Sequence, residues 1–238
     1  MKIKWYRFVI FSFLSILFIS LQMILPASAY EYRNYITTQV SFDKQQEYLD
    51  RLNFELLTDD SEKHPFECFA ISSDGLIALG FDTSDDAIIY VYDTNGEFEY
   101  GFRFLNKHCA FTVFFEDEVL SIYWGKSRYI GSFDSEGNCL RLHELVNCAQ
   151  NSDAYHSDRY RPNEGEINNI QYKAERVAGY LGGYTCFTII DGANSCVIFD
   201  VSQIYRQRIM IFCVFAAVIL WLLCYTFIKK RMTKSITQ

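Results

Sequence analysis

Two clusters of carboxylates come closest, by residue type and spacing, to a catalytic arrangement. The stretch DTSDDA carries Asp82, Asp85 and Asp86, and the stretch FEDE, residues 115–118, carries Glu116. Two such carboxylates can act as acid and as base or nucleophile, as they do in glycosidases. Acidic residues grouped on the loops of a β protein are usually solvated, because charged side chains rarely leave water. The pattern leaves a carboxylate-dependent hydrolase outside the cytoplasm as the less favoured alternative.

The stretch AYHSDRY places His156, Ser157 and Asp158 next to one another. These are the residue types of a hydrolase triad, but a triad needs separate structural elements to fix its geometry. The sequence has no G-x-S-x-G, H-E-x-x-H, phosphate-binding-loop or dinucleotide-binding motif. We therefore predict a protein that is not an enzyme and assign it no catalytic residue, metal ligand or cofactor.

The stretch YVYDTNGEF, residues 90–98, has the acidic and amide residues of a cation-binding loop. A calcium loop of the EF-hand type starting at Asp93 would need glycine at its sixth position and glutamate at its twelfth. Those positions hold Phe98 and Phe104, and the related stretch GSFDSEGNC, residues 131–139, fails in the same way. Both stretches are therefore predicted to be hairpin turns. The turn residues are Asn95, Gly96, Glu136 and Gly137.

The first turn joins two segments with the character of β-strands. In residues 97–104, EFEYGFRF, aromatic residues alternate with others, as in a half-buried antiparallel strand. Residues 87–93, AIIYVYD, supply a β-branched and aromatic partner. A two-residue type I′ loop at Asn95-Gly96 would put the four aromatic side chains of the second strand on one face. Its register pairs Asp93 with Phe98, Val91 with Tyr100 and Ile89 with Phe102.

Units of four such strands recur along the chain. Asp93 and Asp134, which open the two turns, lie 41 residues apart, a spacing typical of propeller blades. A third, degraded copy is expected at Val177–Asp200, after a polar insert at Ala149–Asn169 that is predicted to be a surface loop. We predict a mainly β domain of antiparallel meander repeats over residues 68–205. The arrangement is a partial or small propeller, a β-sandwich, or a sheet with an open edge that a partner completes.

The segment 30–67 departs from these repeats. Residues 35–42, YITTQVSF, have strand character, and residues 43–57 are predicted to form a helix capped by Asp43. We interpret the segment as a divergent region that could supply a further blade.

The stretches FAISSDGLIALGF and IYVYDTNGEFEYGFRF resemble a group of bacterial, Gram-positive-type membrane-anchored proteins of unassigned function. The resemblance covers about residues 68–200 and rests on the Asp-Gly and Asn-Gly turns. It implies propeller-like β repeats with a membrane segment near one end. Residues 114–129, FFEDEVLSIYWGKSRY, depart from the pattern because the second unit lacks its turn glycine. The resemblance implies no catalytic residue.

Six cysteines lie between the two apolar ends of the chain, which allows three disulfides in an oxidising compartment. Cys186 and Cys196 flank a predicted hairpin symmetrically, so one hypothesis is a bridge between them. The alternative is that these residues are small apolar strand residues with free thiols. There is no C-x-x-C motif.

Both ends of the chain have the composition of membrane segments. Phe8–Leu25 and Ile209–Ile228 carry no charge, and 20 helical residues span about 30 Å, enough to cross a bilayer core. Ala27, Ser28 and Ala29 have the small side chains that a signal peptidase accepts. Residues 1–29 are predicted to be a signal peptide cleaved after Ala29, or otherwise a retained transmembrane helix.

Basic residues predict the orientation. Three precede the first apolar segment, and Lys229, Lys230, Arg231 and Lys234 lie in the short tail 229–238 after the second. Positive residues stay in the cytoplasm, so residues 30–205 are predicted to lie outside it, as in a single-pass type I protein of the cell membrane. This domain holds all 29 acidic but only 13 of the 22 basic residues, a net charge of −16. Such charge discourages binding to nucleic acid and to anionic lipid.

The sequence therefore predicts a membrane-anchored extracytoplasmic protein that binds or scaffolds a protein or surface ligand, with the bilayer as its other partner and no nucleic acid. An alternative is an accessory subunit of a membrane complex, which would act through its transmembrane helix and a sheet edge. Aromatic strand residues are expected in the core, and Trp124 is the first candidate among them for an exposed position, as the less favoured interpretation.

Overall fold

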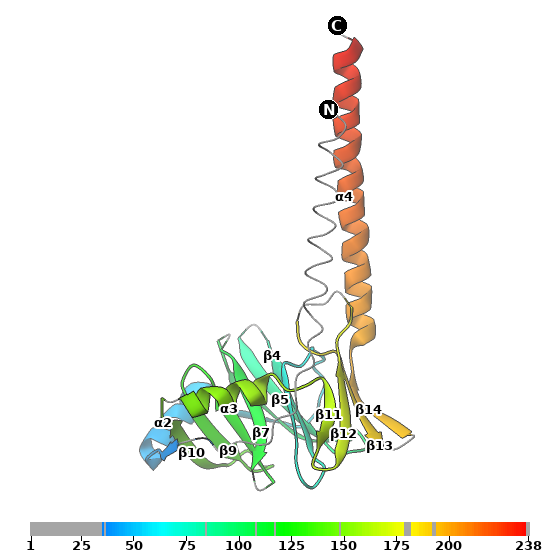
Figure 1. Ribbon diagram of the computed structural model, residues 1–238. Helices are drawn as coiled ribbons and strands as arrows, with labels where there is room; N and C mark the ends of the chain where they lie inside the picture. The colour runs from blue at the N-terminus through cyan, green and yellow to red at the C-terminus, as the bar shows by residue number, and fades with distance from the viewer. Residues whose placement is uncertain are drawn as a thin grey trace. The chain divides into compact units, whose positions relative to one another are not determined.

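The computed structural model describes residues 35, 37–83, 85–107, 109–116, 118–147, 149–178, 182–191 and 194–236. The predicted segment Phe8–Leu25 and the predicted cleavage after Ala29 lie outside these residues. The described chain is mainly β, as predicted, with three antiparallel sheets and the helices α2 (Phe42–Leu52), α3 (Ala149–Arg159) and α4 (Ser202–Ile236) (Figure 1).

The sheets are named here by their place in the fold. The α3 sheet has the order β1 (Thr37–Gln39), β10 (Cys139–Leu145), β9 (Tyr129–Phe133), β8 (Val119–Trp124), β7 (Phe111–Glu116). The middle sheet has the order β2 (Glu55–Leu57), β6 (Phe98–Leu105), β5 (Asp86–Tyr92), β4 (Ile77–Asp82), β3 (Cys68–Ile71). The α4 sheet has the order β11 (Glu164–Ile167), β12 (Ile170–Glu175), β13 (Cys186–Asp191), β14 (Asn194–Asp200).

Three strands of the middle sheet, β3, β4 and β5, are buried on both faces. On one face, large side chains such as Phe69 and Phe81 pack against the α4 sheet in one hydrophobic core. On the other face, small side chains such as Ala70 and Ala78 pack against the α3 sheet in a second core. Because neither face meets water, β3, β4 and β5 are nearly continuous apolar runs in the sequence.

The small side chains of the second face let the α3 sheet approach closely. A Cβ added to Gly80 of β4 would lie 2.6 Å from Sγ of Cys68 and 2.9 Å from the ring of Phe111. Phe111 is the first residue of β7 and is fully buried in the second core. The two sheets therefore meet where an aromatic ring lies over a residue that has no side chain.

The turns at Asp93 and Asp134 have the same hydrogen bonds. Oδ1 of Asp93 accepts from the N–H groups of Asn95 and Glu97 at 2.9 and 2.8 Å. Oδ1 of Asp134 accepts from the N–H groups of Glu136 and Asn138 at 3.0 and 2.8 Å. Each turn therefore uses one aspartate to satisfy two backbone donors of a tight loop.

The loop conformation differs from the expected type I′ turn. Only the glycines have positive φ, +87° at Gly96 and +84° at Gly137, whereas type I′ would also require it at Asn95. The Asp93 N–H donates to the Glu97 carbonyl at 3.0 Å, which closes a three-residue loop that ends in a glycine. The prediction of a two-residue loop was wrong, because the hydrogen bond that closes the hairpin joins Asp93 to Glu97 and leaves three residues between them.

This extra residue changes the register next to the turn. Val91 lies opposite Tyr100 and Ile89 opposite Phe102, as predicted, but Phe98 pairs with Tyr92 and not with Asp93. A bulge separates the two registers. Phe98 therefore faces away from Phe102 and contacts the rings of Tyr90 and Tyr92 on the opposite face of the sheet.

The segments outside the repeats extend the sheets. β1 pairs with β10 and β2 with β6, so the N-terminal region adds an edge strand to two sheets and does not form a separate blade. Helix α2 begins at Phe42 with Ser41 as its N-cap, whereas the cap was predicted at Asp43. The helix ends at Leu52, five residues before the predicted end at residue 57. The insert at residues 149–169 is not the predicted loop, because it forms α3 and β11. Within the described residues the three sheets do not close into a barrel or a propeller.

Substitution of the turn glycines tests this account of the loops. Alanine in the left-handed region costs about 1–2 kcal/mol, so Gly96→Ala and Gly137→Ala should each lower the free energy of unfolding by about that amount. Asparagine tolerates the same φ better, so Gly96→Asn should lose less than Gly96→Ala. Chemical unfolding of the full chain in detergent, followed by near-ultraviolet circular dichroism, measures the order. An alanine variant as stable as the asparagine variant would contradict the assigned φ.

Candidate functional site: the base of the C-terminal helix

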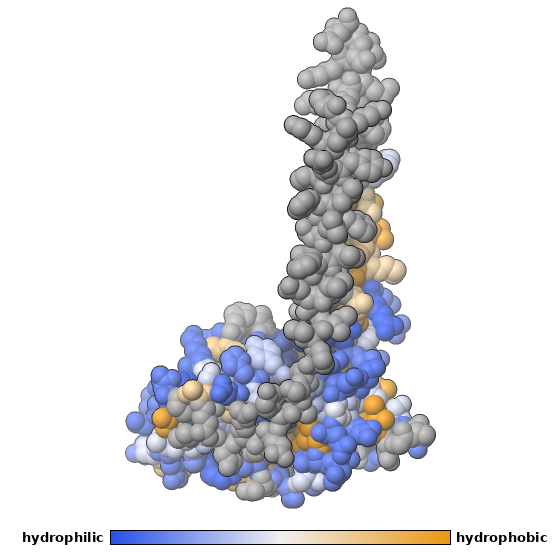
Figure 2. Space-filling model, viewed as in Figure 1, coloured by the Kyte–Doolittle hydropathy of each residue, from blue (hydrophilic) through white to orange (hydrophobic). Residues whose placement is uncertain are grey.

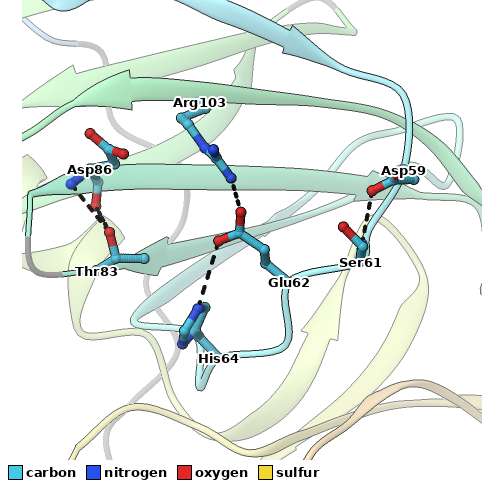
Figure 3. Close-up of polar contacts among 7 residues, drawn as sticks. All are labelled: Asp59, Ser61, Glu62, His64, Thr83, Asp86 and Arg103. Carbon is cyan, nitrogen blue, oxygen red and sulfur yellow. Dashed lines mark hydrogen bonds and ion pairs between the residues drawn. The ribbon is translucent and has the colours of Figure 1, made fainter.

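The loop carboxylates do not converge on a site. Asp82 accepts a hydrogen bond from Nδ2 of Asn106 at 3.2 Å. The N–H of Asp86 donates to Oγ1 of Thr83 at 3.2 Å, and the Asp86 carbonyl accepts from Thr83 (Figure 3). Glu116 lies on another sheet, 3.8 Å from Arg141. No group of three histidine, cysteine, aspartate or glutamate residues in the described chain could hold a metal ion.

His156 and Asp158, from the run that has the residue types of a hydrolase triad, make separate contacts on α3. Asp158 is buried, where it accepts a hydrogen bond from the Tyr35 hydroxyl at 2.6 Å and pairs with Arg161 at 3.2 Å. The His156 ring stacks on Tyr160 near the helix end. Consecutive helical residues point in different directions, so this run does not assemble a nucleophile, a base and an acid.

Asp158 instead connects the N-terminal end of the domain to α3. Burial raises the pKa of Asp158 above its ordinary value, although Arg161 opposes this rise. Burial and the nearby Asp158 also raise the pKa of Tyr35. Tyr35 further contacts the rings of Phe114 and Tyr123, so the segment before β1 is fixed on the outer face of the α3 sheet.

A second polar cluster fixes the irregular segment between β2 and β3. The Glu62 carboxylate accepts a hydrogen bond from Arg103 of β6 and lies 3.8 Å from Nε2 of His64 (Figure 3). Two residues earlier, Asp60 accepts from the Tyr92 hydroxyl at 3.0 Å. These contacts join one segment to the middle sheet and leave the carboxylates engaged with protein groups.

The strand geometry does not support a bridge between Cys186 and Cys196, and Trp124 is buried. Cys186 and Cys196 are both free, and the register pairs Cys186 with Asp200 but Cys196 with Ile189. They therefore point to opposite faces of the hairpin, because neighbouring positions on a strand alternate. Trp124 is only 3% exposed, packed between Tyr48 and Phe104, so it belongs to the core and not to an exposed aromatic surface.

The base of α4 is built into the β domain. Val201, the single residue between β14 and α4, is buried, and its N–H donates to the Thr185 carbonyl at 2.8 Å. The Ser202 N–H donates to Oδ1 of Asp200 at 2.7 Å, which places a carboxylate at the positive end of the helix dipole. Tyr205, one turn further, is buried in the core between the middle sheet and the α4 sheet. The helix therefore starts inside the domain, without a flexible linker.

Beyond this base the helix is apolar and exposed. Residues Ser202–Trp221 are long and apolar enough to cross a membrane. Figure 2 shows the hydrophobic surface of α4 giving way to hydrophilic surface where the helix meets the β domain. The large apolar side chains of α4 that are 50–74% exposed are Met210, Ile211, Phe212, Val214, Phe215, Val218, Ile219, Leu220 and Trp221. A soluble domain does not leave such a continuous apolar surface in water.

Comparison with known proteins adds no assignment, because no protein-family model, curated protein or solved structure matches the chain. The base of α4 is thus the candidate site that the contacts themselves identify. Sequence reasoning found the apolar helix but not its first turn, because the signal there is only Val201 and Tyr205 among polar neighbours.

The buried carboxylate of Asp158 should make the stability of the protein depend on pH. Its raised pKa means that its stabilising contribution is fully present below the unfolded pKa of 3.8 and is lost as pH rises through the folded value. Asp158→Asn keeps an acceptor for Tyr35 but cannot titrate. The difference in melting temperature between wild type and Asp158→Asn should therefore shift in favour of wild type on acidification from about pH 7 to about pH 4.

Asp134→Asn is the matched control with the opposite sign. Hydrogen bonding from Asn138 lowers the pKa of Asp134, so its contribution is present above pH 3.8 and is lost on acidification. Calorimetry from about pH 7 down to about pH 2.5 should show the Asp158 difference growing between pH 7 and pH 4, whereas the Asp134 difference should stay nearly constant there and fall only below pH 3.8. The same trend in both would contradict the assignment at Asp158.

Proposed function

We propose that this chain is a single-pass membrane protein whose β domain lies outside the cytoplasm and binds or scaffolds another molecule at the cell surface. The observation that carries the proposal is α4, an exposed apolar helix whose first turn is part of the core of the β domain. A helix of this composition is stable in hydrocarbon and costly in water. Its position makes the β domain an element fixed next to the membrane.

The basic residues that follow the apolar run of α4 support the orientation. Lys229, Lys230 and Arg231 follow the apolar run, and positive residues are retained on the cytoplasmic side. In this orientation residues 30–205 are extracytoplasmic, and residues 1–29 act as the signal that exports them. A type I protein of the cell membrane results.

The packing of the sheets supports a propeller-like domain, although a short one. The Asp134 turn packs with Gly137 against Leu56 and Phe102 of the middle sheet. The Asp93 turn packs with Gly96 against Val197 and Ile198 of the α4 sheet. Each turn thus packs on strands of the neighbouring sheet, and this repeated packing of similar sheets side by side supports a propeller-like arrangement. Such repeats present loops and faces for binding, which is why we favour a binding or scaffolding role.

A role as an accessory subunit is the second candidate. The exposed side chains of α4 between Met210 and Trp221 could pack against other membrane helices as well as against lipid. Crosslinking in native membranes separates the two: a discrete partner band that depends on α4 supports the subunit, and recovery of monomer alone contradicts it.

Two valines with similar exposure test the membrane assignment. Val218 lies at the centre of the apolar run and is 50% exposed, and Val197 on β14 is 55% exposed. Arginine at the centre of a membrane helix costs about 2.5–3.5 kcal/mol of insertion. Val218→Arg should therefore release much of the chain on alkaline carbonate extraction, whereas Val197→Arg should stay in the membrane fraction. Equal retention of both variants would contradict a membrane span at α4.

A further inference from the structure

Three arginines surround the base of α4 without a carboxylate partner. Arg206 and Arg208 lie on the second turn of the helix, and Arg176 follows β12. All three are exposed, and among the described residues none of them forms an ion pair. By contrast, Arg51, Arg103, Arg141 and Arg161 each pair with a carboxylate.

Hydrogen bonds bring Arg176 to the helix base. The Thr185 N–H donates to the Glu175 carbonyl at 2.7 Å, next to Arg176. The Thr185 carbonyl in turn accepts from Val201, the residue that precedes α4. Thr185 therefore holds the end of β12 and the start of the helix side by side.

Two of the guanidinium groups lie over aromatic rings. The Arg176 guanidinium is 4.4 Å from the centre of the Tyr184 ring, and that of Arg208 is 5.0 Å from the centre of the Tyr205 ring. Stacking fixes the direction of a long side chain and leaves its N–H groups available to a ligand. Aromatic rings beside arginines are also the composition found at membrane–water interfaces.

The nearby carboxylates contact other groups and, in the described part of the chain, form no ion pair with these arginines. Glu175 pairs with Lys173 at 2.7 Å. Asp200 accepts the hydrogen bond from the Ser202 N–H. The arginines therefore remain available although the domain as a whole is acidic. Salt screens the electrostatic field of each charged group beyond about 10 Å, so the charges close to the helix base decide which ligand binds there.

The position along α4 puts the arginines at the level of lipid headgroups. The seven residues Ser202–Arg208 precede Ile209, the start of the apolar run, and form about 10 Å of helix. Arg206 and Arg208 lie within the last three of these residues. The headgroup layer is about 5–8 Å thick on each side of the hydrocarbon core, so both guanidinium groups fall within it.

We propose that the base of α4, formed by Arg176, Arg206 and Arg208 with the rings of Tyr184 and Tyr205, binds the phosphates of anionic lipid headgroups and seats the β domain on the outer leaflet. The site rests on the proposed membrane span at α4. Guanidinium groups bind phosphate oxygens with two parallel hydrogen bonds, which a hydrated ammonium does not. The acidic remainder of the domain is repelled by the same lipids, so the domain is held by one end only.

Hydrogen exchange of the full chain in lipid nanodiscs tests the site. The amides of Gln203 and Ile204 belong to the first turn of α4 and have no partner four residues earlier within the helix. Together with the amides of Arg176 and Val177 they report whether lipid covers the base. We expect these amides to exchange several-fold more slowly in discs that contain phosphatidylglycerol than in discs of phosphatidylcholine alone.

Substitution identifies the groups responsible. Each arginine near an anionic surface contributes roughly five-fold to binding, so Arg176→Gln, Arg206→Gln and Arg208→Gln combined should abolish the difference between the two lipids. The matched control is Arg51→Gln, Arg128→Gln and Arg141→Gln, which removes the same charge from α2 and the α3 sheet and should leave the difference intact.

The possible results separate this site from the membrane span. Fast exchange along Met210–Trp221 in both kinds of disc would contradict the span itself. Slow exchange there with equal rates at the base in both lipids would retain the span and overturn the headgroup site. A difference that the arginine substitutions leave unchanged would also overturn it.

Discussion

Burial of β3, β4 and β5 of the middle sheet on both faces is the constraint on which the rest of the structure depends. A sheet without a solvent face needs apolar side chains at almost every position, and it needs a cover on each side. The α3 sheet covers the face with small residues, and the α4 sheet covers the face with large ones. At its β6 edge the middle sheet is extended by β2, and near β3 the bridge between Phe66 and Tyr184 joins it to the α4 sheet. The sheets are therefore parts of one folding unit, since removing a flanking sheet would expose a complete core.

The middle sheet and the α3 sheet meet this constraint with corresponding strand positions. The residues of β4 that face the α4 sheet are Ile77, Leu79 and Phe81, and their counterparts on β8, which face the middle sheet, are Leu120, Ile122 and Trp124. The α3 sheet thus directs toward the middle sheet the same face that the middle sheet directs toward the α4 sheet. The series ends on both sides for different reasons. Helix α3 covers the far face of the α3 sheet through Tyr155, and the α4 sheet carries the Lys173–Glu175 ion pair away from the core.

Period-two alternation, the Asn-Gly and Glu-Gly turns and the spacing of 41 residues were enough to predict mainly antiparallel β structure and most of one register. They could not predict the bulge that turns Phe98 to the other face, because one inserted residue has no signature in an alternating pattern. Helix α3 was missed because it lacks an apolar stripe; the buried Ala154 and Asp158 do not resemble one. The apolar run of α4 was predictable from composition alone. Its rooted first turn was not, since that depends on contacts between Thr185 and Val201 that are distant in sequence.

This rooted turn limits what the domain can bind. A domain on a flexible linker explores the volume that its linker allows, and each binding event then orders the linker at an entropic cost. Here a single buried residue, Val201, separates β14 from α4, so the height and tilt of the domain above the apolar run are set by the fold. A partner that is itself held at the membrane meets such a domain at a high effective concentration and in one orientation. A soluble ligand gains nothing from the fixed height. For the membrane-anchored binding role proposed above, the junction therefore favours a membrane-bound partner over a diffusing one, and in that role the β domain would act as a spacer as well as a binding surface.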